Sequence, residues 1–204
     1  LIDSVTDATT EAWFRRLDLF ARADGTDGAT FSAFGRFLGQ LAETKPEFVL
    51  GYLPRLDGPL ATFLPVLLNG LLQTALRPQT LAVMDQWIVD GQNLAQLAWQ
   101  QRTANPFDVG LLCRILQRAI EINDLATVTN ALIASADQFD AHPGTLISEV
   151  FMPAIVFLEA SGKYDWLRWP WTSWLSKGIV EGLDEASAER LLKALVHCPA
   201  LEHN

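Results

Sequence analysis

Cysteine and histidine are scarce in this chain, since only two cysteines and three histidines occur among its 204 residues. Cys113 and Cys198 lie far apart in the sequence, so they do not form the dense disulfide framework of a small secreted domain. His142, His197 and His203 include no pair three or four positions apart, and a zinc site needs about four converging ligands. We therefore expect no bound metal and a reducing compartment, the cytoplasm.

Positive charge is also in short supply, because 15 lysines and arginines stand against 24 aspartates and glutamates. The formal net charge is −9 and the isoelectric point is about 4.7. Proteins that bind nucleic acids neutralise phosphates with basic side chains. The best basic group here contains Arg102, Arg114 and Arg118, and it is diluted by Glu121 and Asp124. The sequence therefore argues against a nucleic-acid partner and suits a basic one.

Signature motifs of common enzymes are missing, among them G-x-S-x-G, H-E-x-x-H and G-x-G-x-x-G. The segment ASGKYD (160–165) lacks the spacing of a phosphate-binding loop, and ADGTDGAT (23–30) lacks the ligand positions of an EF-hand. The carboxylates of Glu181, Asp184 and Glu185 lie in a polar linker, where nothing would raise a pKa for acid catalysis. We predict neither a catalytic site nor a cofactor.

Strand-like alternation of apolar and polar residues is sustained nowhere. Apolar residues instead recur at helical spacing, and glycines and prolines separate the apolar segments. The connections are short, so consecutive helices are expected to be antiparallel neighbours. We predict an all-α fold with helices at residues 9–23, 30–43, 46–56, 60–75, 79–90, 93–103, 107–122, 124–138, 145–160, 170–182 and 187–197.

Several residues predict where these helices begin. A proline is tolerated in the first turn of a helix, where its missing N–H has no intrahelical acceptor, and four prolines fit such positions: Pro46, Pro78, Pro106 and Pro170. Thr44 and Asn105 precede two of them by one or two positions and are predicted N-caps. Ser187 is predicted to begin the last helix.

One charge-free run, residues 58–76, has about the length that a membrane span requires. It contains two prolines, an asparagine, a glutamine and two threonines, which suit a buried helix better than a span. We expect this run to be buried in the protein, and we expect no membrane association.

Two proline-centred segments resemble each other. TFLPVLLNGLL (62–72) and VFMPAIVFLEA (150–160) share an aromatic residue two positions before a proline, with apolar residues after it. This pattern resembles the HEAT repeat, whose first helix is often kinked by proline. Asp165 and Arg168 loosely match the turn aspartate and second-helix arginine of that family, whereas the midpoint near Val109 has no proline. The resemblance implies antiparallel hairpins stacked as a HEAT-like α-solenoid, with an irregular helical bundle as the alternative.

Four tryptophans crowd into KYDWLRWPWTSWL (163–175). The helix predicted to start at Pro170 carries an apolar stripe at helical spacing, formed by Trp171, Trp174, Leu175, Gly178 and Ile179. We expect Trp171 and Trp174 to be buried, and Gly178 to let another helix approach closely.

The other two tryptophans, Trp166 and Trp169, precede this helix together with Tyr164 and Arg168. Tryptophan, tyrosine and arginine are the residue types most enriched at binding hot spots. Side chains of this size also suit a structural plug at the end of a helical stack. Both interpretations stay open, and the functional hypothesis is a partner-binding surface made of Tyr164, Trp166, Arg168 and Trp169.

Taken together, these features favour a single helical repeat domain, residues 1–204, within a larger protein of a bacterial defence or ATPase type. Its predicted function is non-catalytic binding of another protein or of an adjacent domain of the same chain. One alternative is a stand-alone acidic inhibitor or immunity protein that masks a basic partner. Another is an enzyme whose cleft a single sequence does not reveal. The sequence leaves the oligomeric state open.

Overall fold

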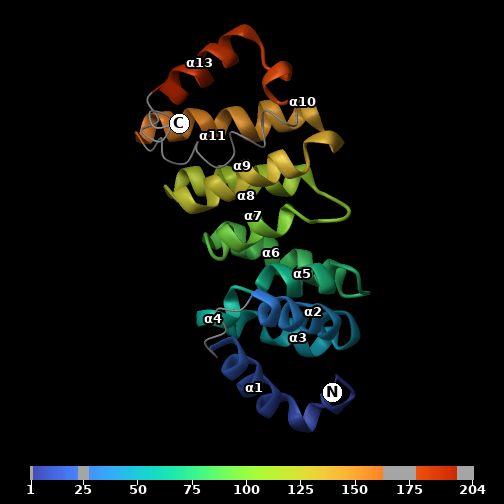
Figure 1. Ribbon diagram of the computed structural model, residues 1–204. Helices are drawn as coiled ribbons and strands as arrows, with labels where there is room; N and C mark the ends of the chain where they lie inside the picture. Colours follow the sequence, from blue (N-terminus) through green and yellow to red (C-terminus); the bar gives the residue numbers. More distant parts are fainter. Residues whose placement is uncertain (1, 23–27, 163–177, 197–204) are drawn as a thin grey trace. The chain divides into compact units, whose positions relative to one another are not determined.

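The computed structural model describes residues 2–22, 28–162 and 178–196 (Figure 1). These residues form helices and turns and contain no strand, so the predicted all-α fold is confirmed for the part described. The α-helices are α1 (Thr10–Arg22), α2 (Gly28–Thr44), α3 (Pro46–Tyr52), α4 (Gly58–Ala61), α5 (Leu64–Leu72), α6 (Arg77–Asp90), α7 (Leu94–Gln101), α8 (Val109–Glu121), α9 (Leu125–Asp137), α10 (Pro143–Leu146), α11 (Met152–Ser161) and α13 (Glu185–Val196). Shorter elements are the 3-10 turns η1 (Ile2–Ser4), η2 (Asp7–Thr9), η3 (Leu53–Arg55), η4 (Phe139–Ala141) and η7 (Val180–Gly182), and the π-helical turn η5 (Ile147–Phe151).

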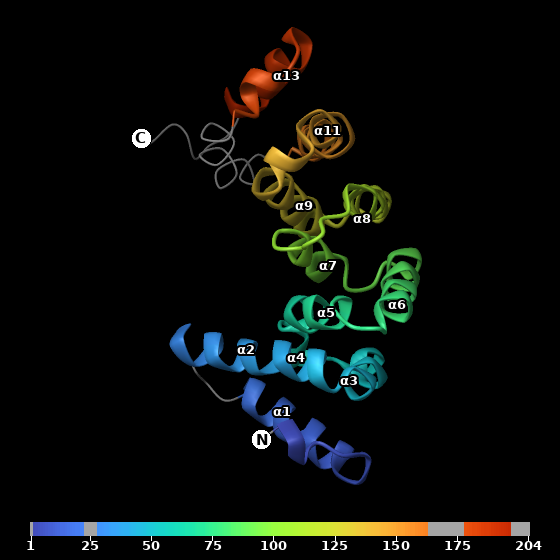
Figure 2. The ribbon, with the colours of Figure 1, turned by 90° about the vertical axis from the view of Figure 1, so that its right-hand side faces the viewer.

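The chain divides into two compact units, an N-terminal unit (Leu1–Gln86) and a C-terminal unit (Trp87–Asn204). In the N-terminal unit, α2 and α5 make the most extensive helix–helix contact, and they lie side by side in Figures 1 and 2. Glycine makes this close approach possible. A Cβ atom on Gly70 would lie 2.6 Å from the carbonyl oxygen of Gly39 and 2.7 Å from the Cβ of Ala42.

The charge-free run at residues 58–76 belongs to this unit. It does not form one helix, because α4 ends at Ala61 and α5 begins at Leu64 after a turn. Most of α5 is buried, and the fully enclosed side chains include those of Leu64, Leu68 and Leu71. The prediction of burial is confirmed, whereas the prediction of one continuous helix over 60–75 is wrong.

Helix α1 is attached to the end of α3 by an aromatic cluster. The rings of Phe14 and Tyr52 stack with centroids 4.2 Å apart, and the guanidinium of Arg55 lies 5.0 Å and 4.9 Å from the two ring centroids. Glu11 holds the cluster together, because its carboxylate accepts hydrogen bonds from Arg55 at 2.7 Å and from the Tyr52 hydroxyl at 3.0 Å.

This cluster predicts a pH dependence for the attachment of α1. The hydrogen bond from Arg55, followed by that from Tyr52, lowers the pKa of Glu11 below its usual 4.5. Burial, followed by the hydrogen bond to Glu11, raises the pKa of Tyr52 above its usual 10.0. The lowered pKa makes the Glu11 contribution complete above pH 4.5 and lost as the pH falls through the folded-state pKa. The raised pKa makes the Tyr52 contribution complete below pH 10.0 and lost as the pH rises through its folded-state pKa.

The measurement compares urea unfolding midpoints of the wild type and Glu11→Gln as a function of pH. We expect the wild type to be more stable at neutral pH. The difference should shrink as the pH falls below the usual carboxyl range, because the wild-type carboxylate becomes protonated there. A difference that stays constant down to low pH would contradict the role assigned to Glu11.

In the C-terminal unit, α7, α8 and α9 pack against one another (Figure 2). Aspartates cap the starts of α8 and α9. Asp108 accepts a hydrogen bond from the backbone N–H of Leu111 at 3.0 Å, and Asp124 accepts one from the N–H of Thr127 at 3.1 Å. Helix α8 then buries one face of a regular 3.6-residue period, formed by Leu111, Leu112, Ile115, Leu116 and Ala119.

Several predicted helix starts are corrected. Asn105 is not an N-cap and Pro106 is not in a first turn, because α8 begins at Val109 with Asp108 as its cap. Thr44 is the last residue of α2, although Pro46 does open α3. The last helix begins at Glu185 rather than Ser187, whose N–H donates to the Asp184 carboxylate at 2.7 Å.

The predicted helix over 170–182 lies mostly outside the described residues, and its described end differs from the prediction. Gly178 has a φ of +70°, a left-handed conformation that ends α-helices, so a helix running through it to 182 is wrong. A Cβ on Gly178 would meet the Glu181 carboxylate at 2.7 Å. This glycine therefore serves a turn and not a close approach of another helix.

The longest apolar helix in the described residues runs from Pro143 to Ser161 as α10, η5 and α11 in succession. By length and composition alone it could cross a membrane, although core helices of soluble proteins pass the same test. Its residues Val150, Phe151 and Leu158 are buried, and the helix contacts α9 and α8.

Pro153 explains the π-helical turn in this helix. It has no N–H to donate to the carbonyl of Glu149, and its ring would clash with that carbonyl in a regular α-helix. The wider turn η5, Ile147–Phe151, immediately precedes Met152 and Pro153 and absorbs the conflict. Pro65 differs, because it lies in the first turn of α5, where a new helix begins after the turn that follows α4. The two proline-centred segments are therefore not equivalent in local structure.

Candidate functional site

The residues predicted to bind a partner, Tyr164, Trp166, Arg168 and Trp169, lie outside the described residues. The same is true of Trp171 and Trp174, which were predicted to be buried. The described neighbour of that stripe, Ile179, is buried. The partner-binding surface and the two buried tryptophans stay predictions from the sequence.

A second tryptophan–arginine pair lies within the described residues, at the end of α7. Trp99 is 46% exposed, which is high for so large an apolar side chain. The guanidinium carbon of Arg102 lies 4.1 Å from the centroid of the Trp99 ring. This distance is well within the range of a cation–π contact, so one face of the exposed ring is covered by a cation.

Helix α9 holds this pair in place. Arg102 Nε donates a hydrogen bond to Asp137 Oδ2 at 2.6 Å, in an ion pair that is only partly exposed. The side-chain amide of Gln138 donates to the Arg102 carbonyl at 2.8 Å, and that of Asn130 donates to the Ala95 carbonyl at 3.0 Å. Polar side chains of α9 and of Gln138, which follows it, thus fix both ends of α7, and the arginine that covers Trp99 is fixed with them.

The chemistry of this surface, formed by Trp99, Arg102 and Asp137, is of a kind that suits recognition of a partner. The charge of Arg102 is balanced by Asp137, so the exposed ring lies beside a neutralised ion pair. A large aromatic side chain whose neighbours are already ordered loses little conformational freedom on binding. Tryptophan and arginine also head the residue types found at binding hot spots.

The sequence held one signal for this surface. Trp99 and Arg102 are three positions apart, a spacing that brings side chains together on a helix. Arg102 was instead grouped with Arg114 and Arg118 as the best basic cluster. In the structure Arg118 also forms an ion pair, with Glu121 at 2.9 Å, so at least two of these three arginines are neutralised.

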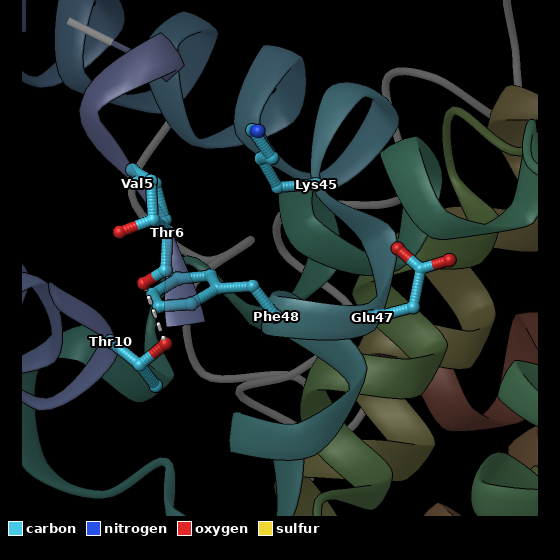
Figure 3. A pocket seen from close by; sticks show the side chains of 6 residues that line it. All are labelled: Val5, Thr6, Thr10, Lys45, Glu47 and Phe48. Atoms are coloured by element: carbon cyan, nitrogen blue, oxygen red, sulfur yellow. Dashed lines mark hydrogen bonds between the residues drawn. The ribbon is translucent and has the colours of Figure 1, made fainter. Parts of the chain in front are cut away.

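One pocket in the described part of the chain has a volume of about 360 Å³ and lies between the N-terminal segment and the start of α3 (Figure 3). It is broadly open and is lined by Val5, Thr6, Thr10, Lys45, Glu47 and Phe48. The Phe48 ring extends toward the two threonines, whereas the charged ends of Lys45 and Glu47 point away from it (Figure 3). The Thr10 hydroxyl donates to the Thr6 carbonyl at 3.1 Å. The lining therefore places no activated nucleophile beside a base.

The described part of the chain holds neither a metal-binding cluster nor a reactive thiol. No three histidine, cysteine, aspartate or glutamate side chains in residues 2–22, 28–162 and 178–196 gather as a metal site would require. Burial, with smaller effects from Glu149 and Asp108, raises the pKa of the Cys113 thiol above its usual value. Cys113 is therefore a protonated, weakly nucleophilic thiol near neutral pH.

Comparison with known proteins adds no identification, because no family model, no curated protein and no solved structure matches the chain.

Proposed function

We propose that this protein is a non-catalytic helical domain that binds another protein or an adjacent domain of the same chain. The surface of Trp99, Arg102 and Asp137 carries the proposal. Its exposed indole is covered on one face by Arg102, and Asp137 on the neighbouring helix fixes that arginine. A partner would gain contact with a large apolar ring whose surroundings are already ordered.

The proposal includes a HEAT-like α-solenoid, a cytoplasmic location and a larger parent protein. Support for the solenoid comes from the C-terminal unit, where α7 contacts both α8 and α9, and α8 also contacts α9. The side-chain bonds between α7 and α9 join residues 35 and 36 positions apart. A helix pair every 30 to 50 residues is typical of such repeats. Tyr164, Trp166, Arg168 and Trp169 are proposed as a second part of the binding surface.

The test is partner capture with the wild type and with Trp99→Ala, each immobilised and exposed to lysate of the source cell. A hot-spot residue contributes about 2 kcal/mol or more, so we expect the captured partner to bind Trp99→Ala roughly 30-fold more weakly. The unfolding midpoint should fall only moderately, because nearly half of the side chain is exposed, and binding is therefore compared at a temperature where both proteins are folded. Capture is read by mass spectrometry and affinity by titration with the identified partner.

Ile122→Ala is the matched control, since Ile122 lies in the same unit and is similarly exposed, at 42%. It should retain the partner at wild-type affinity. Equal retention by Trp99→Ala and the wild type would contradict the proposed site. A basic partner that is released by high salt, with no dependence on Trp99, would instead favour the acidic inhibitor.

A further inference from the structure

The first and last α-helices of the described chain, α1 and α13, each bury one face and leave large apolar side chains on the other. In α1, Leu19 is 68% exposed and Phe20 is 61% exposed. In α13, Leu192 is 59% exposed and Val196 is 75% exposed. Such side chains are unremarkable singly, but pairs of them on one helix face mark candidate interaction sites.

The exposed face of α1 is basic as well as apolar. Arg15 and Arg16 are exposed, and neither forms an ion pair with a residue in the described part of the chain. The Arg16 guanidinium instead lies 5.2 Å from the centroid of the Trp13 ring. By contrast, Arg22 in the same helix is paired with Asp18 at 2.8 Å. In an acidic protein, this face has a local excess of positive charge.

The exposed face of α13 carries two glutamates on the same stripe as its exposed apolar side chains. Glu185, Glu189, Leu192 and Val196 are all exposed and follow one another at spacings of four, three and four residues. This spacing places them on one stripe of the helix. Glu189 pairs with Lys193, but both side chains are about two-thirds exposed, so this pair can exchange for another cation at little cost. The stripe is acidic at its N-terminal end and apolar at its C-terminal end.

We propose that the protein associates head to tail, with the face of α1 in one copy packed on the face of α13 in the next. In both helices a charged residue precedes an exposed leucine by three positions, Arg16 before Leu19 and Glu189 before Leu192. Arginine therefore meets glutamate, and leucine meets leucine, when the two helices run parallel. Opposite charges at matching positions favour this pairing and disfavour α1 on α1.

The geometry of such an interface determines the form of the assembly. The two faces differ, so each association leaves one basic face and one acidic face unused, and further copies can add until a ring closes or an open chain forms. This inference goes beyond the proposed function and uses none of the residues of the Trp99 surface. Either one can therefore fail without the other.

The test is sedimentation velocity on the full chain at low salt, from about 10 µM to about 1 mM, where small interfaces self-associate. For the wild type we expect the weight-average mass to rise past that of a dimer. Leu19→Glu and Leu192→Glu should each be monomeric alone. An equal mixture should form a dimer and nothing larger, because the first variant keeps the α13 face and the second keeps the α1 face.

Two further variants test the charge pairing and the specificity. Arg16→Glu should weaken association at least tenfold, and adding Glu189→Arg should restore it. Ile122→Glu, on an exposed site elsewhere, should associate as the wild type does. A wild type that stays monomeric over the whole range would overturn the proposal, as would a mixture that stays monomeric. If Leu19→Glu or Leu192→Glu alone still associated as the wild type does, the interface would lie at other residues, and the proposal would be overturned as well.

Discussion

Replacing Gly70 by valine is expected to destabilise the N-terminal unit by about 3 kcal/mol or more. A Cβ at this position would lie 2.6 Å from the Gly39 carbonyl oxygen, a distance that real Cβ atoms essentially never show. The obstacle is backbone, so no side chain can rotate away to make room. The helices α2 and α5 would have to separate, and their contact is the most extensive in the unit.

Hydrogen exchange read by mass spectrometry is the suitable measurement, because it reports on α2 and α5 separately from the rest of the chain. Protection should fall in these two helices. Gly51→Ala in α3 is the matched control, since a Cβ there meets nothing within 4 Å. That variant should be neutral or stabilised by up to about 1 kcal/mol, the helix-propensity advantage of alanine. A Gly70→Val protein as stable as the wild type would contradict the close α2–α5 crossing.

Phe151→Ala is expected to cost about 3–5 kcal/mol in the C-terminal unit, the usual cost of truncating a buried aromatic side chain. Phe151 is 1% exposed and is among the largest fully buried side chains of the protein. It lies at the end of η5, where the helix already departs from regular geometry.

The free energy of unfolding is measured by urea denaturation followed by far-UV circular dichroism. Val156→Ala in the same helix is the control, because Val156 is exposed, and its cost should stay below about 1 kcal/mol. Similar losses for both variants would mean that η5 and α11 do not pack as described.

The fold class and most helix positions could be predicted because apolar periodicity is a local property. Helix α8, for example, buries five side chains at helical spacing, all visible in the sequence. Helix starts were harder. Asn105 and Asp108 are both good capping residues, and the chain uses Asp108, whose carboxylate accepts the N–H of Leu111. N-cap propensity alone does not decide between two such capping residues that lie only a few positions apart.

The candidate site could not be predicted in the same way. Trp99 becomes distinctive only through Arg102 and Asp137, and Asp137 lies 35 positions from its partner arginine. Which aspartate approaches which arginine depends on how α7 packs on α9, and that packing is set by many apolar contacts at once. Trp166 and Trp169 are predicted as site residues because they are close together in the sequence, and closeness in sequence says little about whether their side chains are exposed.

The π-helical turn before Pro153 has a consequence for insertions and deletions. A π-helical turn holds one residue more than an α-helical turn, so its geometry depends on the number of residues in the segment. Removing one residue from Ile147–Phe151 would let the helix run regularly as far as the proline allows. It would also remove the wide turn that accommodates Pro153, so the proline ring would clash with the carbonyl four residues before it. The length of this segment is therefore constrained more tightly than its composition, and a deletion here would harm the fold more than most substitutions.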